Sequence, residues 1–427
     1  MSATLPASPG LEITQLASGL TVVTEAMPHV GTVTLGLFVG VGSRHERADE
    51  HGLSHLIEHM AFKGTRRRTA RAIAEAIENV GGEINAATSV EDTSYTARVL
   101  PEDLGLAVDV LGDLITDSVF DEAELARERN VILQEIAAVE DTPDDLVNDA
   151  FLETAFGGQA LGRPILGTPR TIRGLGAGAI RAFLAREYTP GRMVLSAAGA
   201  LRHLDVVEMA ARAFEALAPS EAPAPEPARY TGGERRLKRR LEQANLVLGW
   251  PGLSFKDPAY FAAHMFAHVL GGGLTSRLWH EVRETRGLAY GIDAFHWPFA
   301  DCGLFGVGAG TSGDDLPELV EVTLAAARAA SRDTEPAEVA RGKAQLKVSL
   351  LAALEAPGGR IERNARQLLA WGRVIPAEEI VAKVDAVTVE AVREAGAAVL
   401  AGPPTVAAIG PIGRLPPLAA IRAASAA

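Results

Sequence analysis

The first half of the chain contains several short apolar runs of the kind that form strands. Two segments within residues 11–43, GLTVVTEAM and TVTLGLFVGVGS, are rich in β-branched residues and bounded by glycines, as strands commonly are. EINAATSVEDTSYTARVL alternates apolar and polar positions, and this period of two predicts two further strands. RMVLSAAGAL, residues 192–201, predicts another. These runs together predict one sheet.

Helical periodicity separates these strands. The pattern predicts helices over residues 69–80, 101–115 and 121–142, and one more in LDVVEMAARAFEAL. Gly81 and Gly82 stop the first helix, and Pro143 ends the third. The first half therefore reads as a mixture of strands and helices.

The second half repeats this outline after a proline-rich stretch. Prolines 219, 223, 225 and 227 lie among small and acidic residues, which is typical of a linker. Beyond it come strand NLVLGWPGL, a helix from Pro258, strands in AYGIDAFHWPFADCGLFGVGAG, helices in LPELVEVTLAAARAA and over 336–354, and strand PTVAAIGPI. We predict domains over 1–217 and 235–427 joined by a linker over 218–234. Each is expected to be an α+β unit with helices packed on one face of a largely antiparallel sheet.

Composition narrows the class of protein. The chain has 427 residues, 47% of them hydrophobic, but no run nears the ~18 apolar residues of a membrane helix, and MSATLPASPG lacks the pattern of a signal peptide. With a single cysteine, Cys302, a cytoplasmic location and no membrane partner are expected. The net charge of −13 disfavours nucleic acid. The one basic run, RRLKRR, reads as the start of a strand.

Candidate chemistry is concentrated in HGLSHLIEHMAFKGT, residues 51–65. On a helix, His55 and His59 share a face and Glu58 lies beside them, so two imidazoles and a carboxylate converge. A catalytic zinc site needs one more protein ligand. Glu135 is the best candidate, and Glu128 lies about two turns upstream on the same predicted helix. Taken alone, the cluster could also be the polar face of an amphipathic helix.

The second half of the chain can be compared with the first at the positions of this cluster. Aligning HGLSHLIEHMAFKG with YFAAHMFAHVLGGG places His264 and His268 opposite His55 and His59. Aligning LARERNVILQEI with VARGKAQLKVSL places Gly342 and Ser349 opposite Glu128 and Glu135, while Ala267 stands opposite Glu58. The second copy keeps two imidazoles and lacks every carboxylate, so we expect no second catalytic metal site there.

With these motifs the chain resembles the M16 family of zinc metallopeptidases, in particular the short-subunit group of the mitochondrial processing peptidase and its bacterial relatives. H-x-x-E-H is the inverzincin motif, and the step of 76 residues from His59 to Glu135 fits the family spacing. NAATS, ERNVILQEI, YTPGRMVLSAAG and GGGLTSRLWHEVRETRGLAYGI follow in the family order. The resemblance implies two similar α/β-sandwich halves of the M16/LuxS-like metallopeptidase type.

The resemblance also implies roles for the cluster. His55, His59 and Glu135 would be ligands of Zn²⁺, Glu58 the general base, and Glu128 a supporting carboxylate. This suits the chemistry, because zinc lowers the pKa of its water toward ~7 and a carboxylate can take the proton that the water releases.

Further family positions lie outside the cluster. Arg283 and Tyr290 match an arginine and a tyrosine, seven residues apart, that hold substrate carbonyls and help to stabilise the oxyanion. In the family they face the zinc from another half of a clamshell chamber. For a chain of this length that implies a homodimer with each active site shared between subunits.

Asn85, Ala86 and Thr88 match the family strand that pairs with substrate backbone. Ala87 stands where a larger residue is common, so a plain edge strand is an equal alternative for residues 85–88.

The sequence thus predicts a zinc endopeptidase that cuts peptides or extended unfolded segments in a closed dimeric chamber. Two alternatives remain open. One is a non-catalytic scaffold subunit, since some family members cleave nothing. The other is the zinc subunit of a heteromeric processing peptidase.

Overall fold

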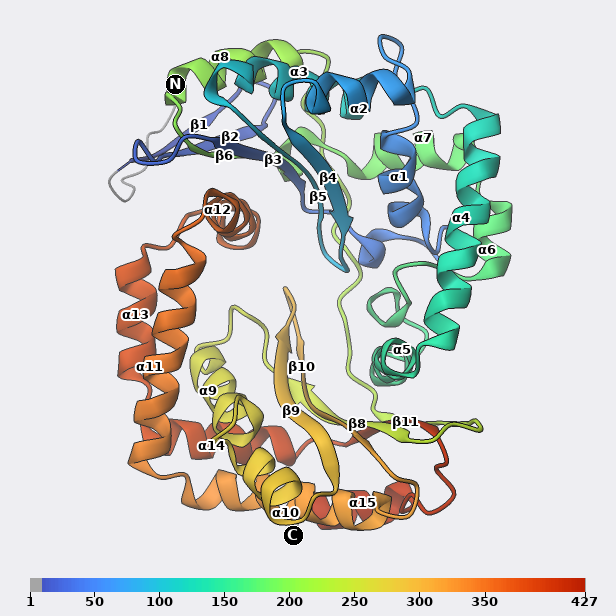
Figure 1. The fold of residues 1–427 in the computed structure, drawn as a ribbon, viewed down its shortest axis with the longest axis vertical. Helices are drawn as coiled ribbons and strands as arrows, with labels where there is room; N and C mark the ends of the chain where they lie inside the picture. The colour runs from blue at the N-terminus through green and yellow to red at the C-terminus, as the bar shows by residue number, and fades with distance from the viewer. Residues whose placement is uncertain (1–9, 427) are drawn as a thin grey trace. The chain divides into compact units, whose positions relative to one another are not determined.

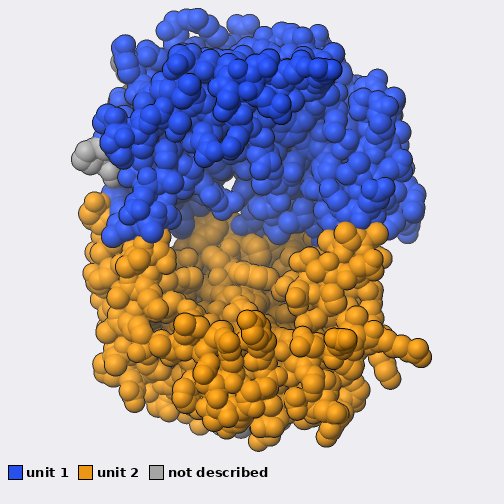
Figure 2. Space-filling view, viewed as in Figure 1, with its two compact units in different colours: residues 1–136, 164–226, 350–377 blue, residues 137–163, 227–349, 378–427 orange. Residues whose placement is uncertain are grey.

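A computed structural model describes residues 10–426 of the chain. Its contacts divide the chain into two compact units (Figure 2). Unit 1 comprises residues 1–136, 164–226 and 350–377, and unit 2 comprises 137–163, 227–349 and 378–427. These units differ from the 1–217 and 235–427 boundaries because two segments are exchanged: 137–163 packs in unit 2, and 350–377 packs in unit 1.

Unit 1 is built on a six-stranded sheet with the order β1-β2-β6-β3-β5-β4 (Figure 1). Only the β2–β6 pair is parallel, and the other four neighbouring pairs are antiparallel. The strands are β1 (Leu11–Gln15), β2 (Thr21–Ala26), β3 (Val33–Val39), β4 (Glu83–Thr88), β5 (Thr93–Val99) and β6 (Met193–Gly199). The expected largely antiparallel sheet is confirmed.

The helices of unit 1 cover both faces of this sheet. They are α1 (Leu53–Ala61), α2 (Ala70–Glu78), α3 (Leu104–Thr116), α4 (Glu122–Asp141, whose last turn belongs to unit 2), α6 (Pro169–Gly174), α7 (Ala177–Glu187), α8 (His203–Ala213) and α12 (Pro357–Trp371). Leu35 and Leu37 of β3 point into the main core with α1, α3 and α8, whereas Phe38 points the other way and packs with Ile361 and Ala365 of α12. Because successive side chains of a strand point to opposite faces of the sheet, β3 contributes to an apolar layer on each face. Helix α12 covers the second of these layers.

Unit 2 repeats the arrangement with five strands in the order β7-β11-β8-β10-β9. The strands are β7 (Gly233–Lys238), β8 (Ala244–Gly252), β9 (Ala289–Pro298), β10 (Gly303–Thr311) and β11 (Thr405–Gly410). Again one pair, β11–β7, is parallel, and the rest are antiparallel. The basic run RRLKRR, residues 235–240, covers the end of β7 and the two residues after it, rather than the start of a strand as expected.

The helices of unit 2 also lie on both faces of its sheet. They are α5 (Pro143–Ala155), α9 (Tyr260–Gly271), α10 (Leu316–Asp333), α11 (Pro336–Ala353), α13 (Ala377–Ala386), α14 (Val389–Leu400) and α15 (Leu418–Ala426), with a π-helix over Trp279–Thr285. Leu248 and Trp250 face the core that α9 and α14 cover. On the opposite face, Phe151 of α5 packs edge-to-face against Phe295, with ring centroids 6.1 Å apart.

Each sheet therefore has its second face covered by a helix from the other half of the sequence: α12 for unit 1 and α5 for unit 2. Within residues 10–426, every helix is too short or too polar to cross a lipid bilayer.

Candidate metal centre

Helix α1 carries the H-x-x-E-H motif and is held by its buried face. Leu53, Leu56, Ile57 and Met60 are buried and leave the three motif side chains half-buried on the remaining face. The start of the helix is fixed by Glu46, whose carboxylate accepts hydrogen bonds from the backbone N–H groups of Gly52 (2.8 Å) and Ser54 (2.7 Å). Because Glu46 is only 3% exposed, these charge-assisted bonds fix the helix strongly.

The structure brings His55, His59 and Glu135 together. Glu135 Oε2, from α4, lies 3.8 Å from His55 Nε2 and 3.6 Å from His59 Nε2, and one ligand atom from each residue fits within a 4.8 Å cluster. Tetrahedral zinc with bonds near 2.0–2.1 Å spaces its ligands about 3.3 Å apart. The predicted group of three is thus close to the spacing of such a site.

The donor atoms of this cluster are available. Glu135 Oε2 is buried and accepts no hydrogen bond from any residue within 10–426, although it faces two imidazoles. Burial, and then the neighbouring His59, lower the pKa of His55 to about 4, so at neutral pH this ring is uncharged and keeps a lone pair for a cation. A buried carboxylate oxygen and neutral imidazoles form a donor set that Zn²⁺ accepts.

Glu128 orients one of the two imidazoles. Its Oε2 accepts a hydrogen bond from His59 Nδ1 at 2.9 Å, and its Oε1 pairs with Lys63 Nζ at 2.7 Å. Burial alone would raise the pKa of Glu128, but the hydrogen bonds from Lys63 and His59 outweigh burial and lower it. With Nδ1 protonated, His59 turns Nε2 toward Glu135, as a ligand imidazole does.

Glu58 lies beside the cluster with a free carboxylate. No hydrogen bond or ion pair among residues 10–426 engages its side chain. Two buried tyrosines lie near enough to sense its charge: burial, with added contributions from Glu58, raises the pKa of Tyr188 to about 12 and that of Tyr95 well above its usual range. Glu58 is therefore the carboxylate of the motif that is left without a structural partner.

Residues 85–88 form most of β4, one of the two edge strands of the unit 1 sheet. β4 pairs with β5 on one side and contacts α1, and its other edge has no neighbouring strand within the described chain. Asn85 and Ala87 are exposed, while Ala86 and Thr88 are half-buried. The strand can therefore accept a further extended segment, although no contact identifies one.

Arg283 and Tyr290 are brought together in unit 2. The Arg283 guanidinium carbon lies 5.0 Å from the Tyr290 ring centroid and 4.1 Å from that of Trp279, so two rings hold the cation between them. Tyr290 is 84% exposed, a large exposure for an aromatic residue. Arg283 and Trp279 both lie on the π-helix, a rare element that often marks functional sites.

The second copy of the histidine pair has a different surrounding. His268 Nε2 donates to Gln345 Oε1 at 2.7 Å, and Gly342 packs on the His268 ring where the alignment has Glu128 in the first copy. Among residues 10–426, the only group of three or more histidine, cysteine, aspartate or glutamate side chains close enough to share a metal is the one in unit 1.

Three residues of these sites were missed by pattern reasoning. Lys63 and Trp279 lie four residues from His59 and Arg283, and that helical spacing could have indicated both. Glu46 reaches backbone groups six and eight residues away through a loop, and no periodicity signals such a contact.

Comparison with known proteins finds family matches that together cover most of the chain. The family model described as insulinase (peptidase family M16) matches residues 21–169, and the model described as the peptidase M16 inactive domain matches residues 175–346. A protein named as an uncharacterized zinc protease of Streptomyces coelicolor is 40% identical over 93% of this chain and 89% of its own length.

A probable mitochondrial-processing peptidase subunit beta of Arabidopsis thaliana is 37% identical over 96% of this chain and 80% of its own length. A crystal structure of a protease from Helicobacter pylori has the same fold, with a TM-score of 0.87 at 20% identity over 94% of this chain and 99% of that one. The resemblance to the M16 family is thereby confirmed, and the chain belongs to peptidase family M16.

Proposed function

We propose that the chain is a zinc-dependent endopeptidase that hydrolyses peptides or extended unfolded segments in a closed dimeric chamber. The observation that carries this proposal is the convergence of His55, His59 and Glu135, whose facing atoms lie 3.6–3.8 Å apart without a hydrogen bond at Glu135 Oε2. Membership of a family whose relatives are named zinc proteases supports the choice of metal.

The side chains then divide the chemistry between them. Zinc, when bound, supplies the Lewis acidity that acidifies water and polarises the scissile carbonyl. Glu58, which has no structural partner, accepts a proton from the attacking water and returns it to the leaving amine. Glu128 holds the proton on His59 Nδ1 and so fixes the orientation of that ring.

Substrate binding is assigned to two further regions. The free edge of β4, at Asn85, Ala86, Ala87 and Thr88, pairs with the backbone of an extended peptide, which gives affinity with little dependence on sequence. Arg283 and Tyr290 from a second copy of the chain donate to the substrate carbonyl and to the developing oxyanion. Two copies of the chain then share each active site.

The base assignment is tested with Glu58→Gln. The purified variant should keep the zinc content of the wild type and lose about 10²–10⁴-fold in turnover of an unstructured fluorogenic peptide. Glu122→Gln, at the exposed start of α4, is the control and should cleave normally. Equal turnover by Glu58→Gln would refute the assignment.

Sharing of the site is tested with a mixed dimer of Glu58→Gln and Tyr290→Phe chains. Each homodimer should be weak, whereas the mixed dimer contains one intact site and should recover up to about half of the wild-type activity. Absence of any recovery would contradict a shared site.

A second candidate function is the zinc subunit of a heteromeric peptidase. The specific observation in its favour is the similarity to a chain that is named as a subunit. Solution mass and peptide cleavage by the purified chain alone separate the two: an active homodimer supports the first function, and an inactive monomer that binds zinc supports the second.

A further inference from the structure

The carboxylates of the candidate metal centre lie far from the start of the helix that carries them. Helix α4 begins at Glu122, and with a rise of about 1.5 Å per residue Glu135 lies about 20 Å further along its axis. A tilt of about 5° at the start of α4 would move Glu135 by about 1.7 Å, more than the roughly 0.5 Å that a functional site tolerates. Whatever fixes the start of α4 therefore fixes the distance from Glu135 to the imidazoles of α1 (Figure 1).

The loop after α1 is joined directly to the loop before α4. Thr65 and Ser118 face each other in an isolated antiparallel β-bridge. On either side of it, backbone hydrogen bonds of 3.1 Å connect residues 64–66 with residues 117–119. We call these two segments the junction. Because it lies only a few residues from both helices, the junction determines where α4 begins relative to α1.

A buried carboxylate of α3 holds the junction. Asp113 is only 1% exposed, and its Oδ2 accepts a hydrogen bond from Thr65 Oγ1 at 2.8 Å. Thr65 Oγ1 in turn accepts from the backbone N–H groups of Arg67 (3.1 Å) and Arg68 (2.9 Å). Both guanidinium groups pair with Asp113, at 2.9 Å from Arg67 and 2.6 Å from Arg68. Hydrogen bonds to a charged group are strong and directional, whereas the apolar contacts of α4 are not directional.

The residue after the junction shows that the chain is constrained there. Phe120 has a φ of 52°, the only positive φ of a residue other than glycine within 10–426, and its side chain is buried. A bulky residue keeps this left-handed conformation only where its surroundings impose it. Directly after it, Asp121 Oδ1 accepts from the N–H groups of Ala123 (2.9 Å) and Glu124 (3.0 Å). The direction of α4 is therefore set by tertiary contacts rather than by local backbone preference.

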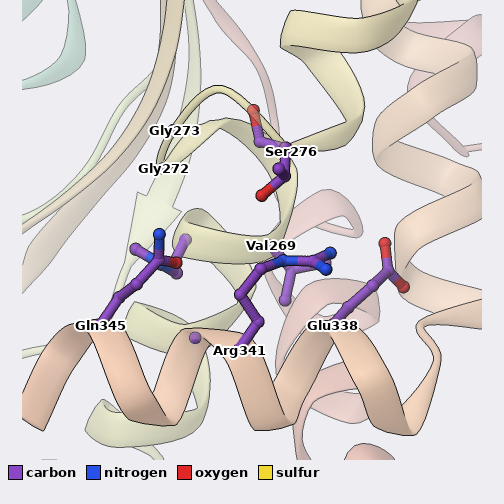
Figure 3. Close-up of a pocket in the computed structure, with 10 residues that line it drawn as sticks. Val269, Gly272, Gly273, Ser276, Glu338, Arg341 and Gln345 are labelled. Carbon is purple, nitrogen blue, oxygen red and sulfur yellow. The ribbon is translucent and has the colours of Figure 1, made fainter.

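The second copy connects its two helices differently. Continuing the alignment of the copies, Leu274 takes the place of Thr65; it has no hydroxyl and is 72% exposed. Arg277, at the position of Arg68, donates to Glu338 of α11 itself, at 2.7 and 2.6 Å. Figure 3 shows the Glu338 side chain on α11 and the loop that follows α9. The buried bond between a hydroxyl and a carboxylate thus occurs in the copy that has the metal ligands.

We propose that Thr65 is a positioning residue of the metal centre: its hydroxyl, bound to Asp113, fixes the junction from which α4 carries Glu128 and Glu135 to the imidazoles of α1. This role rests on the proposed function, in which the cluster binds zinc. Loss of the hydroxyl leaves Asp113 with one hydrogen bond fewer and two backbone N–H groups without that acceptor, which loosens the junction. Every ligand stays in the chain, but α4 holds Glu128 less firmly against His59.

The test compares Thr65→Val, which keeps the shape of the side chain and loses the hydroxyl, with Thr65→Ser, which keeps the hydroxyl. The first measurement is the ¹⁵N NMR spectrum of the His59 ring in metal-free protein labelled with ¹⁵N-histidine, at pH 8, above the ~6.5 of an ordinary histidine. The wild type and Thr65→Ser should show the Nδ1–H tautomer that the hydrogen bond to Glu128 selects. Thr65→Val should show a mixture of both tautomers.

The second measurement is the zinc affinity, by competition with a chromophoric chelator at a temperature at which every variant is fully folded. Stability changes the apparent affinity only through the folded fraction, so a loss of stability alone would leave this value unchanged. Thr65→Val should bind zinc about five- to ten-fold more weakly than the wild type. Thr65→Ser should bind it within about two-fold of the wild type.

Two control variants accompany the test. Thr116→Val removes a hydroxyl that donates to the Gly112 carbonyl within α3, and Glu338→Gln weakens the contact with Arg277 in unit 2. Both should keep the tautomer and the zinc affinity of the wild type.

A wild-type tautomer and affinity in Thr65→Val, or an equal loss in Thr65→Ser or in either control, would overturn the role of Thr65. A wild-type protein that binds no zinc would instead refute the proposed function. The tautomer, which is measured without metal, would then still decide whether Thr65 positions α4 against α1.

Discussion

The two histidine pairs have the same spacing but different surroundings. Both pairs have i, i+4 spacing on a helix, and the sheets of the two units share the order of five strands, to which unit 1 adds β1 at one edge. In unit 1, α4 aims Glu135 at His55 and His59. In unit 2, α11 offers Gly342 and Gln345 instead. The paired helix thus places a carboxylate against both imidazoles in unit 1 and an amide oxygen against one imidazole in unit 2.

The same contrast appears in how each imidazole uses its nitrogens. His59 Nδ1 donates to Glu128, which leaves Nε2 directed at Glu135. His268 Nε2 donates a hydrogen bond to the amide oxygen of Gln345. A cation could bind His268 Nε2 only if that hydrogen bond were broken. In unit 2 a hydrogen bond to an amide thus engages the nitrogen that in unit 1 faces a carboxylate.

The largest expected effect is the loss of zinc affinity when the carboxylate ligand Glu135 of the first copy is removed. Glu135→Gln should weaken zinc binding by more than about 100-fold, the upper end of what loss of an outer hydrogen-bond partner costs. Ser349→Ala, at the aligned position of the second copy, should leave it unchanged. Competition with a chromophoric chelator measures the zinc affinity of each variant. Equal affinities of the two variants would contradict the proposed difference between the two copies.

Loss of the orienting carboxylate should cost less. Glu128→Gln keeps an oxygen near His59 Nδ1 but removes the charge that also binds Lys63, so zinc should bind about 10–100-fold more weakly. Gln345→Leu frees the counterpart imidazole in unit 2 and should not change the zinc content per chain. A second zinc ion in Gln345→Leu would show that the hydrogen bond alone had blocked that site.

A third prediction concerns the starts of the two histidine helices. Glu46 caps α1 from a buried position, whereas the half-buried Asp257 accepts from the Ala259 N–H just before α9. Glu46→Gln should lower the free energy of unfolding by about 1–3 kcal/mol, and each kcal/mol lowers Tm by about 2–4 °C in a domain of this size. Asp257→Asn should change it by less than about 0.5 kcal/mol. Thermal unfolding followed by circular dichroism compares them, and similar losses would contradict the special role of Glu46.

The last prediction is a pH dependence of stability in the second copy. Burial, and then the neighbouring His264, lower the pKa of His296 to about 4, below the ~6.5 of an unfolded chain. The unfolded state therefore binds more protons between these values, so stability falls as pH drops from about 6.5 to 4, by at most about 1.4 kcal/mol per pH unit. His296→Phe should flatten this slope in a series of Tm measurements, whereas His280→Gln, at an exposed position, should not. An unchanged slope in His296→Phe would refute the assignment.

Much of the sheet architecture could be predicted from the sequence. Half-buried strands alternate apolar and polar residues, and the second half of the chain repeats the order of elements in the first half. The strands of EINAATSVEDTSYTARVL became β4 and β5, and PTVAAIGPI became β11, the counterpart of β6. The helix expected from Pro258 begins two residues later, at Tyr260. The convergence of His55, His59 and Glu135 followed from helical spacing and a family motif, while the homodimer and the cytoplasmic location stay predictions.

The exchanged helices could not be predicted in the same way. An amphipathic pattern in residues 357–371 indicates an apolar face but not which sheet will bury it. The sheet that buries this helix is identified by contacts between residues far apart in sequence. Examples are the ion pair of Arg360 with Glu25 and the 2.9 Å hydrogen bond from Asn364 to the same carboxylate. Complementarity of this kind emerges only once the chain is folded.

The exchange of α5 and α12 has a consequence for biosynthesis. A ribosome that has released the first 217 residues has not yet made the helix that covers the second face of the unit 1 sheet, so Val23 and Phe38 stay bare. At about 5–20 residues per second, that helix follows roughly ten seconds or more later. The nascent chain must carry an uncovered apolar sheet face through this interval, which makes it a natural client for chaperones that bind such surfaces during translation.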